Sequence, residues 1–375
     1  MRSTTRYTLQ RFIGRRLLAP GNRVCLCCSV PAYDSKSVDV HHHGDNLKLR
    51  GVMYCENIWA CPVCSALIRR RRQSLTADLF TRTVAAGFRL LFVTFTLRHR
   101  LGQSLATVST MHRDAWLALT RHRAYNRWRA TTGTKWYMRA LEVTHGSNGW
   151  HPHFHVVYVI GPGADPSIED LYELWASAVG SVGGSVVRAA YDAQYADATT
   201  DADTIARYAA SWGGGDWSLS HEVTAGEKLG RRGSRSPFQL AADAMDGDEK
   251  SAMLFREFAD DFKGRRAQTW ARGWLAWLEQ SEEELNDESI TAEELDDDSI
   301  VVRFEKHSYM QLGSSREIML DAIMGRDYSR VVDIAWDRGI DILYINTKYF
   351  GLPSGRVHVN VSGWAYDRYE NLARL

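Results

Sequence analysis

The amino-acid sequence predicts an α+β fold, in which an antiparallel sheet has helices packed on one side. Between residues 88 and 191, strand-like and helix-like patterns follow one another in the order strand, long helix, strand, strand, helix, strand. All six cysteines precede this region, and a small α/β unit follows it beyond an acidic segment. With 375 residues, 45% of them hydrophobic, the chain exceeds one ordinary domain and can bury a sizeable core.

The formal net charge of +1 conceals an uneven distribution of charge. Basic residues crowd the first two thirds, whereas residues 279–298 are acidic and polar and contain no basic residue, which is typical of a solvated linker. The predicted parts are a basic arm with a cysteine-rich module (1–85), a central α+β domain (86–278), an acidic linker (279–299) and a C-terminal accessory domain (300–375).

The N-terminus gives no sign of export or membrane insertion. No apolar run is long enough to span a bilayer, and residues 1–23 are basic and free of acids but lack the core of a signal peptide. A transit peptide is one interpretation of such a start, and a DNA-contacting arm or a disordered tail is the favoured one. We therefore expect a cytoplasmic protein without a membrane partner.

The cysteines form two clusters, one near residue 25 and one near residue 60. Cys25-x-x-Cys28 and Cys61-Pro62-Val63-Cys64 have the usual spacing of the two thiolate pairs of a structural zinc site. Disulfides are the alternative, and the missing secretory signal disfavours them. Cys27, Cys55 and the histidines at 41–43 leave the ligand set open.

The next two patterns are a basic helix and an apolar strand. The helix begins with four arginines, which form either a solvated face or a stripe that contacts phosphates: Arg69, Arg70, Arg71 and Arg72. Residues 88–97 are apolar, β-branched or aromatic and predict a core strand, on which Thr94 and Thr96 share a face. A helix is predicted over about 102–129.

The central pattern is a hairpin that carries histidines. Residues 140–144 predict one strand, and the run after Pro152 predicts the next. His153 and His155 are two residues apart, so both imidazoles lie on one face, and Glu142 lies beside them if the strands pair. Two imidazoles and one carboxylate leave coordination positions open, which suits a catalytic divalent ion better than a structural one.

After this hairpin, a helix is predicted over 166–179, a strand over 184–191 and a further helix over 201–212. The last of these ends at three glycines, Gly213–Gly215, and has acidic residues at its N-terminal end.

Four motifs in a fixed order resemble those of the HUH endonuclease superfamily, and most closely those of plasmid rolling-circle replication initiators. They are the cysteine segment 54–64 with the arginines after it, Phe-Val-Thr-Phe-Thr-Leu at 92–97, His-Pro-His-Phe-His at 151–155, and the tyrosine-bearing helix 201–212 with the basic region that follows it. The resemblance covers residues 25–278. It implies a ferredoxin-like, RRM-like nuclease core in residues 86–278.

The resemblance also implies a nucleophile. Tyr208, on a helix after the metal strand, would attack the scissile phosphate, with Tyr191 and Tyr195 as alternatives. The family pattern is usually Tyr-x-x-Lys, and Ser211 stands at the lysine position here. Arg207 or later arginines would then hold the phosphate. Asp203 would activate water in the closing step, as a carboxylate does in some relatives, although it is equally explained as a helix N-terminal acid.

The implied activity is site-specific nicking and rejoining of one strand at a plasmid origin. The ion would be Mg²⁺ or Mn²⁺, with Zn²⁺ in the cysteine site, and the partners would be single-stranded or hairpin-extruded origin DNA, host helicase and host DNA polymerase. Further DNA contacts are expected from Arg231, Arg232 and Arg235. The alternatives are a transposase or relaxase with the same chemistry, or a zinc-containing DNA-binding protein without catalysis. Residues 300–375 show no motif and suit a dimerisation, origin-binding or host-factor module.

Overall fold

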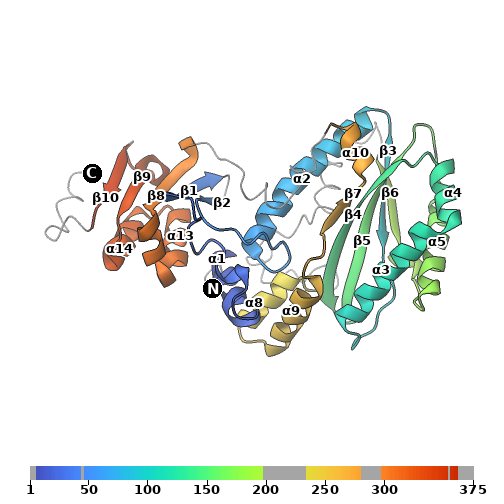
Figure 1. Ribbon diagram of the computed structural model, residues 1–375, viewed down its shortest axis with the longest axis horizontal. Coiled ribbons are helices and arrows are strands. Elements are labelled where there is room, and N and C mark those ends of the chain that lie inside the picture. Colours follow the sequence, from blue (N-terminus) through green and yellow to red (C-terminus); the bar gives the residue numbers. More distant parts are fainter. Residues whose placement is uncertain (1–5, 44–45, 197–233, 280–296, 354, 362–375) are drawn as a thin grey trace. The chain divides into compact units, whose positions relative to one another are not determined.

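The computed structural model describes residues 6–43, 46–196, 234–279, 297–353 and 355–361. The chain divides into two compact units, one formed by Ile58–Thr291 and the other by Met1–Asn57 together with Ala292–Leu375. The structure confirms the predicted α+β class, because each unit contains an antiparallel five-stranded sheet with helices (Figure 1). Within the described ranges, no helix combines the length and apolar character needed to cross a membrane.

The sheet of the first unit contains a ferredoxin-like core. Its strand order is β6-β3-β5-β4-β7, with every neighbouring pair antiparallel. Without the edge strand β7, the elements follow the β-α-β-β-α-β order of that motif. They are β3 (Arg89–Phe95), α3 (Leu105–Arg121), α4 (Arg123–Thr131), β4 (Trp136–Gly146), β5 (Gly149–Ile160), α5 (Ile168–Ser181), β6 (Asp192–Ala196) and β7 (Gln268–Trp270).

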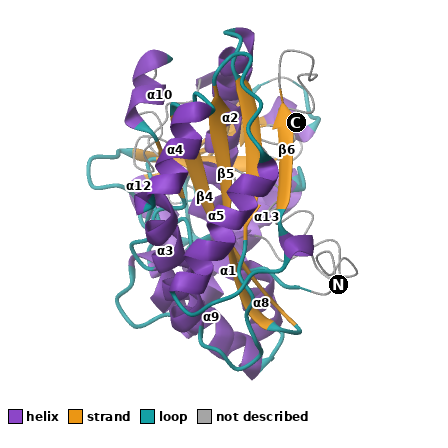
Figure 2. Ribbon diagram, turned by 90° about the vertical axis from the view of Figure 1, so that its right-hand side faces the viewer, coloured by secondary structure: helices purple, strands orange, loops and turns teal. Residues whose placement is uncertain are grey.

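The helices of this core lie on one face of the sheet, as expected, and two helices from outside the core cover the other face. Figure 2 looks onto α3, α4 and α5 in front of the strands, where Trp116, Tyr158 and Trp175 lie in the core. The opposite face packs against α2 (Pro62–Ala85) and α10 (Arg272–Trp277) through Phe80 and Trp274. The reason lies in β5, whose residues 156–160 are all buried, because an uninterrupted apolar run needs cover on two faces.

Two other elements differ from the predicted ones. The helix expected over 102–129 is broken at His122, which is extended and caps α4 through its ring nitrogen. The strand expected over 184–191 begins only at Asp192, after a short 3₁₀ turn at Arg188–Ala190. The apolar residues before it lie in an irregular segment, in which the Ser185 carbonyl accepts a hydrogen bond from the Arg98 amide.

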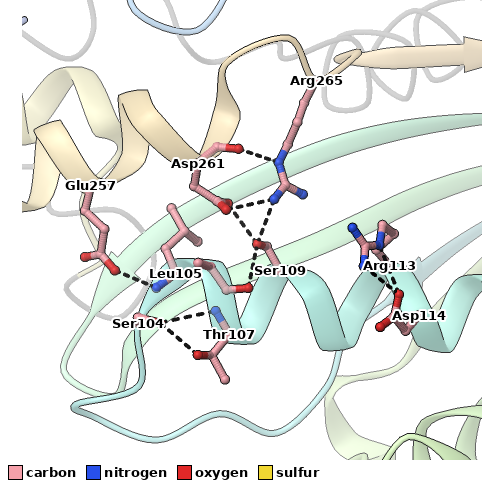
Figure 3. Close-up of polar contacts among 10 residues, drawn as sticks. Ser104, Leu105, Thr107, Ser109, Arg113, Asp114, Glu257, Asp261 and Arg265 are labelled. Carbon is pink, nitrogen blue, oxygen red and sulfur yellow. Dashed lines mark hydrogen bonds and ion pairs between the residues drawn. The ribbon is translucent and has the colours of Figure 1, made fainter.

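Two helices follow the central fold, and the second of them is hydrogen-bonded to α3 (Figure 3). They are α8 (Pro237–Met245) and α9 (Glu249–Phe262). On α9, Glu257 accepts hydrogen bonds from the Leu105 amide (2.6 Å) and from Nε1 of Trp150 (2.8 Å). Asp261 accepts from Ser109 (2.8 Å) and from Arg265 (2.8 Å). A carboxylate at the first turn of α3 is favourable to that helix, and the same carboxylate holds Trp150 at the start of the histidine strand β5.

The second unit is built from both ends of the chain. Its sheet has the order β10-β9-β8-β1-β2, in which β1 pairs with β8. Arg303 on β8 donates from Nε (2.7 Å) and Nη2 (2.9 Å) to the two carboxylate oxygens of Asp39 on β1. Its elements are α1 (Arg6–Phe12), β1 (Ser37–His43), β2 (Asn46–Arg50), β8 (Ile300–Glu305), α12 (Lys306–Gln311), α13 (Arg316–Met324), α14 (Tyr328–Arg338), β9 (Ile342–Asn346) and β10 (Arg356–Val359).

This sheet differs from the expected domain boundaries, which placed residues 1–85 and 300–375 in separate parts. The physical reason is that the β1–β2 hairpin is too small to be stable alone, since two strands rarely form a stable sheet in water. Strands from the far end of the chain complete the sheet, and no local sequence pattern predicts that pairing.

Candidate metal centre

The β4–β5 hairpin brings together the three residues expected to bind a divalent ion. Its register places Glu142 opposite His153 and Ala140 opposite His155. Directly opposite residues of an antiparallel pair share a face, so all three side chains lie on one side of the sheet. Gly146 and Gly149 form the last residue pair of the hairpin, next to the turn. Gly149 has φ +89°, a left-handed conformation that suits glycine.

The three side chains converge on one carboxylate oxygen. Nε2 of His153 lies 3.0 Å and Nε2 of His155 lies 2.8 Å from Oε2 of Glu142. The side chains are 12%, 15% and 26% exposed for His153, His155 and Glu142, so the group is sheltered but reachable from solvent. The donor set of two imidazole nitrogens and one carboxylate oxygen fits a divalent ion with open positions.

The second nitrogen of each histidine also has a partner. Nδ1 of His153 lies 3.2 Å from the His151 carbonyl oxygen, and Nδ1 of His155 lies 3.2 Å from Oγ1 of Thr94. Such outer contacts fix the ring orientation of a metal-binding histidine. Thr94 therefore holds the ring of the candidate ligand His155, a contact that the sequence pattern of Thr94 alone did not indicate.

The charges within the group are coupled. Burial alone would raise the pKa of Glu142, but the charge of His153 and the hydrogen bonds to both histidines hold it well below its usual range. Burial lowers the pKa of His155, whereas the neighbouring Glu142 outweighs burial at His153 and raises the pKa of that ring. An ionised carboxylate beside a neutral imidazole is the state that divalent ions bind.

The predicted nucleophile lies outside the described residues, and so do Asp203, Arg207, Arg231 and Arg232. The two alternative tyrosines are described, and both face the side of the sheet opposite His153 and His155. The Tyr191 hydroxyl donates to the Ile168 carbonyl (3.4 Å), and that of Tyr195 donates to the Pro166 carbonyl (2.7 Å). Burial raises the pKa of Tyr191 and raises the pKa of Tyr195 to about 12. Neither is therefore poised to attack a phosphate at the metal face.

The arginines expected to contact DNA differ in exposure. Arg69 is buried, with Nε donating to Oγ of Ser65 (3.0 Å) and its guanidinium over the Trp59 ring. Arg70 is exposed, and Arg71 and Arg72 are half-buried.

Arg235 has partners within the protein. Its Nη1 donates to Asp243 (2.7 Å) and Ser251 (2.9 Å), and its backbone pairs with His145 at the end of β4. These contacts fasten the described segment after residue 233 to the histidine hairpin.

The structure also gathers a group of four buried cysteines, whose sulfurs all lie within 4.8 Å of one another: Cys27, Cys55, Cys61 and Cys64. This group can hold a metal ion such as Zn²⁺. It differs in two members from the predicted set, because Cys27 and Cys55 stand where Cys25 and Cys28 were expected. Spacing alone could not decide among three cysteines within four residues, and Cys28 adopts a left-handed conformation (φ 54°). None of the six cysteines forms a disulfide.

Fold and site together describe a ferredoxin-like protein with a candidate divalent-ion centre on its sheet, and the comparisons narrow this class. Residues 46–167, which contain all three candidate ligands, match a family model described as a replication protein. The chain is 26% identical over 286 residues to the protein Rep of Streptomyces lividans, which covers 59% of this chain and 63% of that protein. It is also 29% identical over 137 residues to a neomycin resistance protein of Streptomyces cyanogenus, covering 30% of this chain and 31% of that protein.

These matches confirm the predicted resemblance to plasmid replication initiators. The chain spans less than two thirds of the length of the curated relatives it matches. No solved structure matches it significantly.

Proposed function

We propose that this protein initiates rolling-circle plasmid replication by nicking one strand at the origin through a 5′-phosphotyrosine intermediate and later rejoining it. The observation that carries the proposal is the pair of Nε2 atoms directed at one Glu142 oxygen on a ferredoxin-like sheet. The replication-protein family and the Streptomyces Rep protein support the biological setting.

In this proposal Glu142, His153 and His155 hold Mg²⁺ or Mn²⁺ at the target phosphate. The bound ion supplies charge neutralisation at a nonbridging phosphate oxygen. The three residues come from two paired strands, so their positions are set by backbone hydrogen bonds and not by a loop. That rigidity suits a centre that must present phosphorus in line with an attacking group.

Tyr208 is the proposed nucleophile. Its phenol loses its proton, the Oη–P bond forms, the P–O3′ bond breaks, and the departing O3′ takes up a proton. The free 3′-OH is then available to a host polymerase. The reverse reaction, attack of a 3′-OH on the phosphotyrosine, restores the phosphodiester and the phenol without ATP, because the bond energy is retained in the ester. Asp203 is proposed to activate water in a closing step that hydrolyses the ester.

The substrate is proposed to be single-stranded or hairpin-extruded origin DNA, because a phosphate within a duplex is hard to bring to a metal ion held by side chains on the face of a sheet. Arg70, the exposed member of the arginine run, is accessible to a phosphate backbone. Zn²⁺ in the cysteine group would have a structural role.

The decisive test is covalent capture of DNA. Wild-type, Tyr208→Phe and Tyr195→Phe proteins are incubated with Mn²⁺ and end-labelled single-stranded oligonucleotides that tile the origin, and adducts are resolved on a denaturing gel. We expect an adduct with wild type and with Tyr195→Phe, and none with Tyr208→Phe, although that variant still binds the oligonucleotide in a native gel.

Two results would count against the proposal. An adduct that survives Tyr208→Phe would move the nucleophile to another tyrosine. Tight binding without any adduct, across all oligonucleotides, would favour a zinc-containing DNA-binding protein without catalysis.

A further inference from the structure

The three candidate ligands differ in the hydrogen bonds made by the atom that does not point to the centre. His153 and His155 each use their second nitrogen in a hydrogen bond, to the His151 carbonyl and to Thr94. Both short contacts of Glu142 use Oε2. Among the residues that the structure describes, its other oxygen, Oε1, has no hydrogen-bond partner. Carboxylates that bind metal ions are normally hydrogen-bonded by a second group that fixes their orientation.

The side chain of Gln268, in turn, has hydrogen-bonding groups without partners. The residue is only 9% exposed, and neither Nε2 nor Oε1 of its side-chain amide has a hydrogen-bond partner within the described residues. A buried amide without partners destabilises a fold, and native structures retain such groups chiefly where a ligand or a functional state supplies the partner.

The sheet register places these two groups near each other. Ala140 on β4 pairs with His155 on one side and with Gln268 on the other, so Gln268 lies on the metal face. Glu142 is two residues further along β4 and is therefore the diagonal neighbour of Gln268 on that face. Long side chains at diagonal positions of adjacent strands can reach each other.

We infer that Gln268 is the positioning residue for Glu142, donating from Nε2 to Oε1 of the carboxylate when a divalent ion occupies the centre. The inference rests on the proposed divalent-ion site. With this contact, all three ligands have an outer partner from a neighbouring strand or from the hairpin itself. The amide carries no charge, so it orients the carboxylate without competing with the ion for it.

The test separates metal affinity from stability. Gln268→Met keeps the length and volume of the side chain but removes the amide, and Thr269→Val is the matched control, because Thr269 is the next residue on β7 and points to the opposite face. Mn²⁺ binding by the zinc-loaded full chain is measured by calorimetric titration, and the thermal midpoint is measured without added Mn²⁺.

We expect Gln268→Met to weaken Mn²⁺ binding about 10- to 100-fold. Its thermal midpoint should be unchanged or higher by about 2–4 °C, because an unpaired buried amide has been removed. Thr269→Val should bind Mn²⁺ like wild type.

The overturning results are distinct from one another. Equal Mn²⁺ affinity of Gln268→Met and wild type would overturn the inference and leave the metal centre intact. A lower thermal midpoint with unchanged affinity would make Gln268 a structural residue. Failure of the wild-type chain to bind Mn²⁺ would overturn the divalent-ion site and this inference together.

Discussion

Cys25 and Cys27 lie two residues apart in the chain, yet only Cys27 belongs to the group of four sulfurs. Cys27 is fully buried, whereas Cys25 is partly exposed and ends a short 3₁₀ turn. A tetrahedral thiolate site loses most of its affinity when one ligand is replaced, because the remaining sulfurs cannot complete the coordination.

We therefore predict that Cys27→Ser abolishes stoichiometric zinc binding and that Cys25→Ser retains it. Native mass spectrometry of the purified variants checks this directly, with one Zn²⁺ per chain expected for wild type and for Cys25→Ser. Loss of zinc from Cys25→Ser alone would restore the ligand pair that the Cys-x-x-Cys spacing indicates.

At the scale of elements, the candidate centre depends on the turn between β4 and β5. A side chain at position 149 would have to adopt φ +89°, and its Cβ would lie 3.3 Å from the Arg100 carbonyl oxygen and 3.4 Å from Cα of Leu101. Gly163 has a similar φ of +72° but open space around its Cβ position. A side chain at either position would therefore be strained by the positive φ. Of the two positions, only 149 would also crowd the new Cβ against backbone atoms.

Gly149→Ala should lower the free energy of unfolding by about 2–3 kcal/mol, and Gly163→Ala by about 1 kcal/mol. Because the turn sets the register of Glu142 against His153, Gly149→Ala should also weaken Mn²⁺ binding, which Gly163→Ala should leave unchanged. Chemical denaturation and Mn²⁺ titration measure the two effects. Equal losses of stability in both variants would show that crowding at Arg100 has no part in it.

The elements also show what sequence patterns can and cannot reveal. The alternation at His153 and His155 correctly predicted that both imidazoles lie on one face beside Glu142, because strand periodicity fixes which side chains share a side. The uninterrupted apolar run at 156–160 indicated that both faces of the sheet are covered at this strand. Such a run does not indicate which helices cover each face. Thr94 and Gln268 contact or adjoin the centre through register between distant strands, and no local pattern carries register.

At the scale of the whole molecule, one unit depends on segments from both ends of the chain. The hairpin β1–β2 contributes two of the five strands of its sheet, and Asp39, which is 5% exposed, has its ion-pair partner on β8. A chain that stops before β8 would leave this carboxylate unpaired and the edge of β1 open.

A chain truncated after residue 279 should therefore lose hydrogen-exchange protection at 37–50 while residues 89–95 and 149–160 keep theirs. The control is Asp333→Ala in the full chain, a substitution at an exposed position of α14 that should change neither region. Protection of 37–50 in the truncated chain would show that the hairpin is stable without its partner strands.

The pairing of β1 with β8 also has a consequence for synthesis. Asp39 and Arg303 are separated by 264 residues, and at about 5–20 residues per second a ribosome needs roughly 13–50 s to make that stretch. The first strands of the protein therefore emerge long before the strands that complete their sheet, and they remain open to other contacts during that interval. The ferredoxin-like sheet lies between them in the chain, so it can form first. A nascent chain would thus possess its histidine centre before β8 has been made, and the emergence of β8 is the event that allows β1 to enter the second sheet.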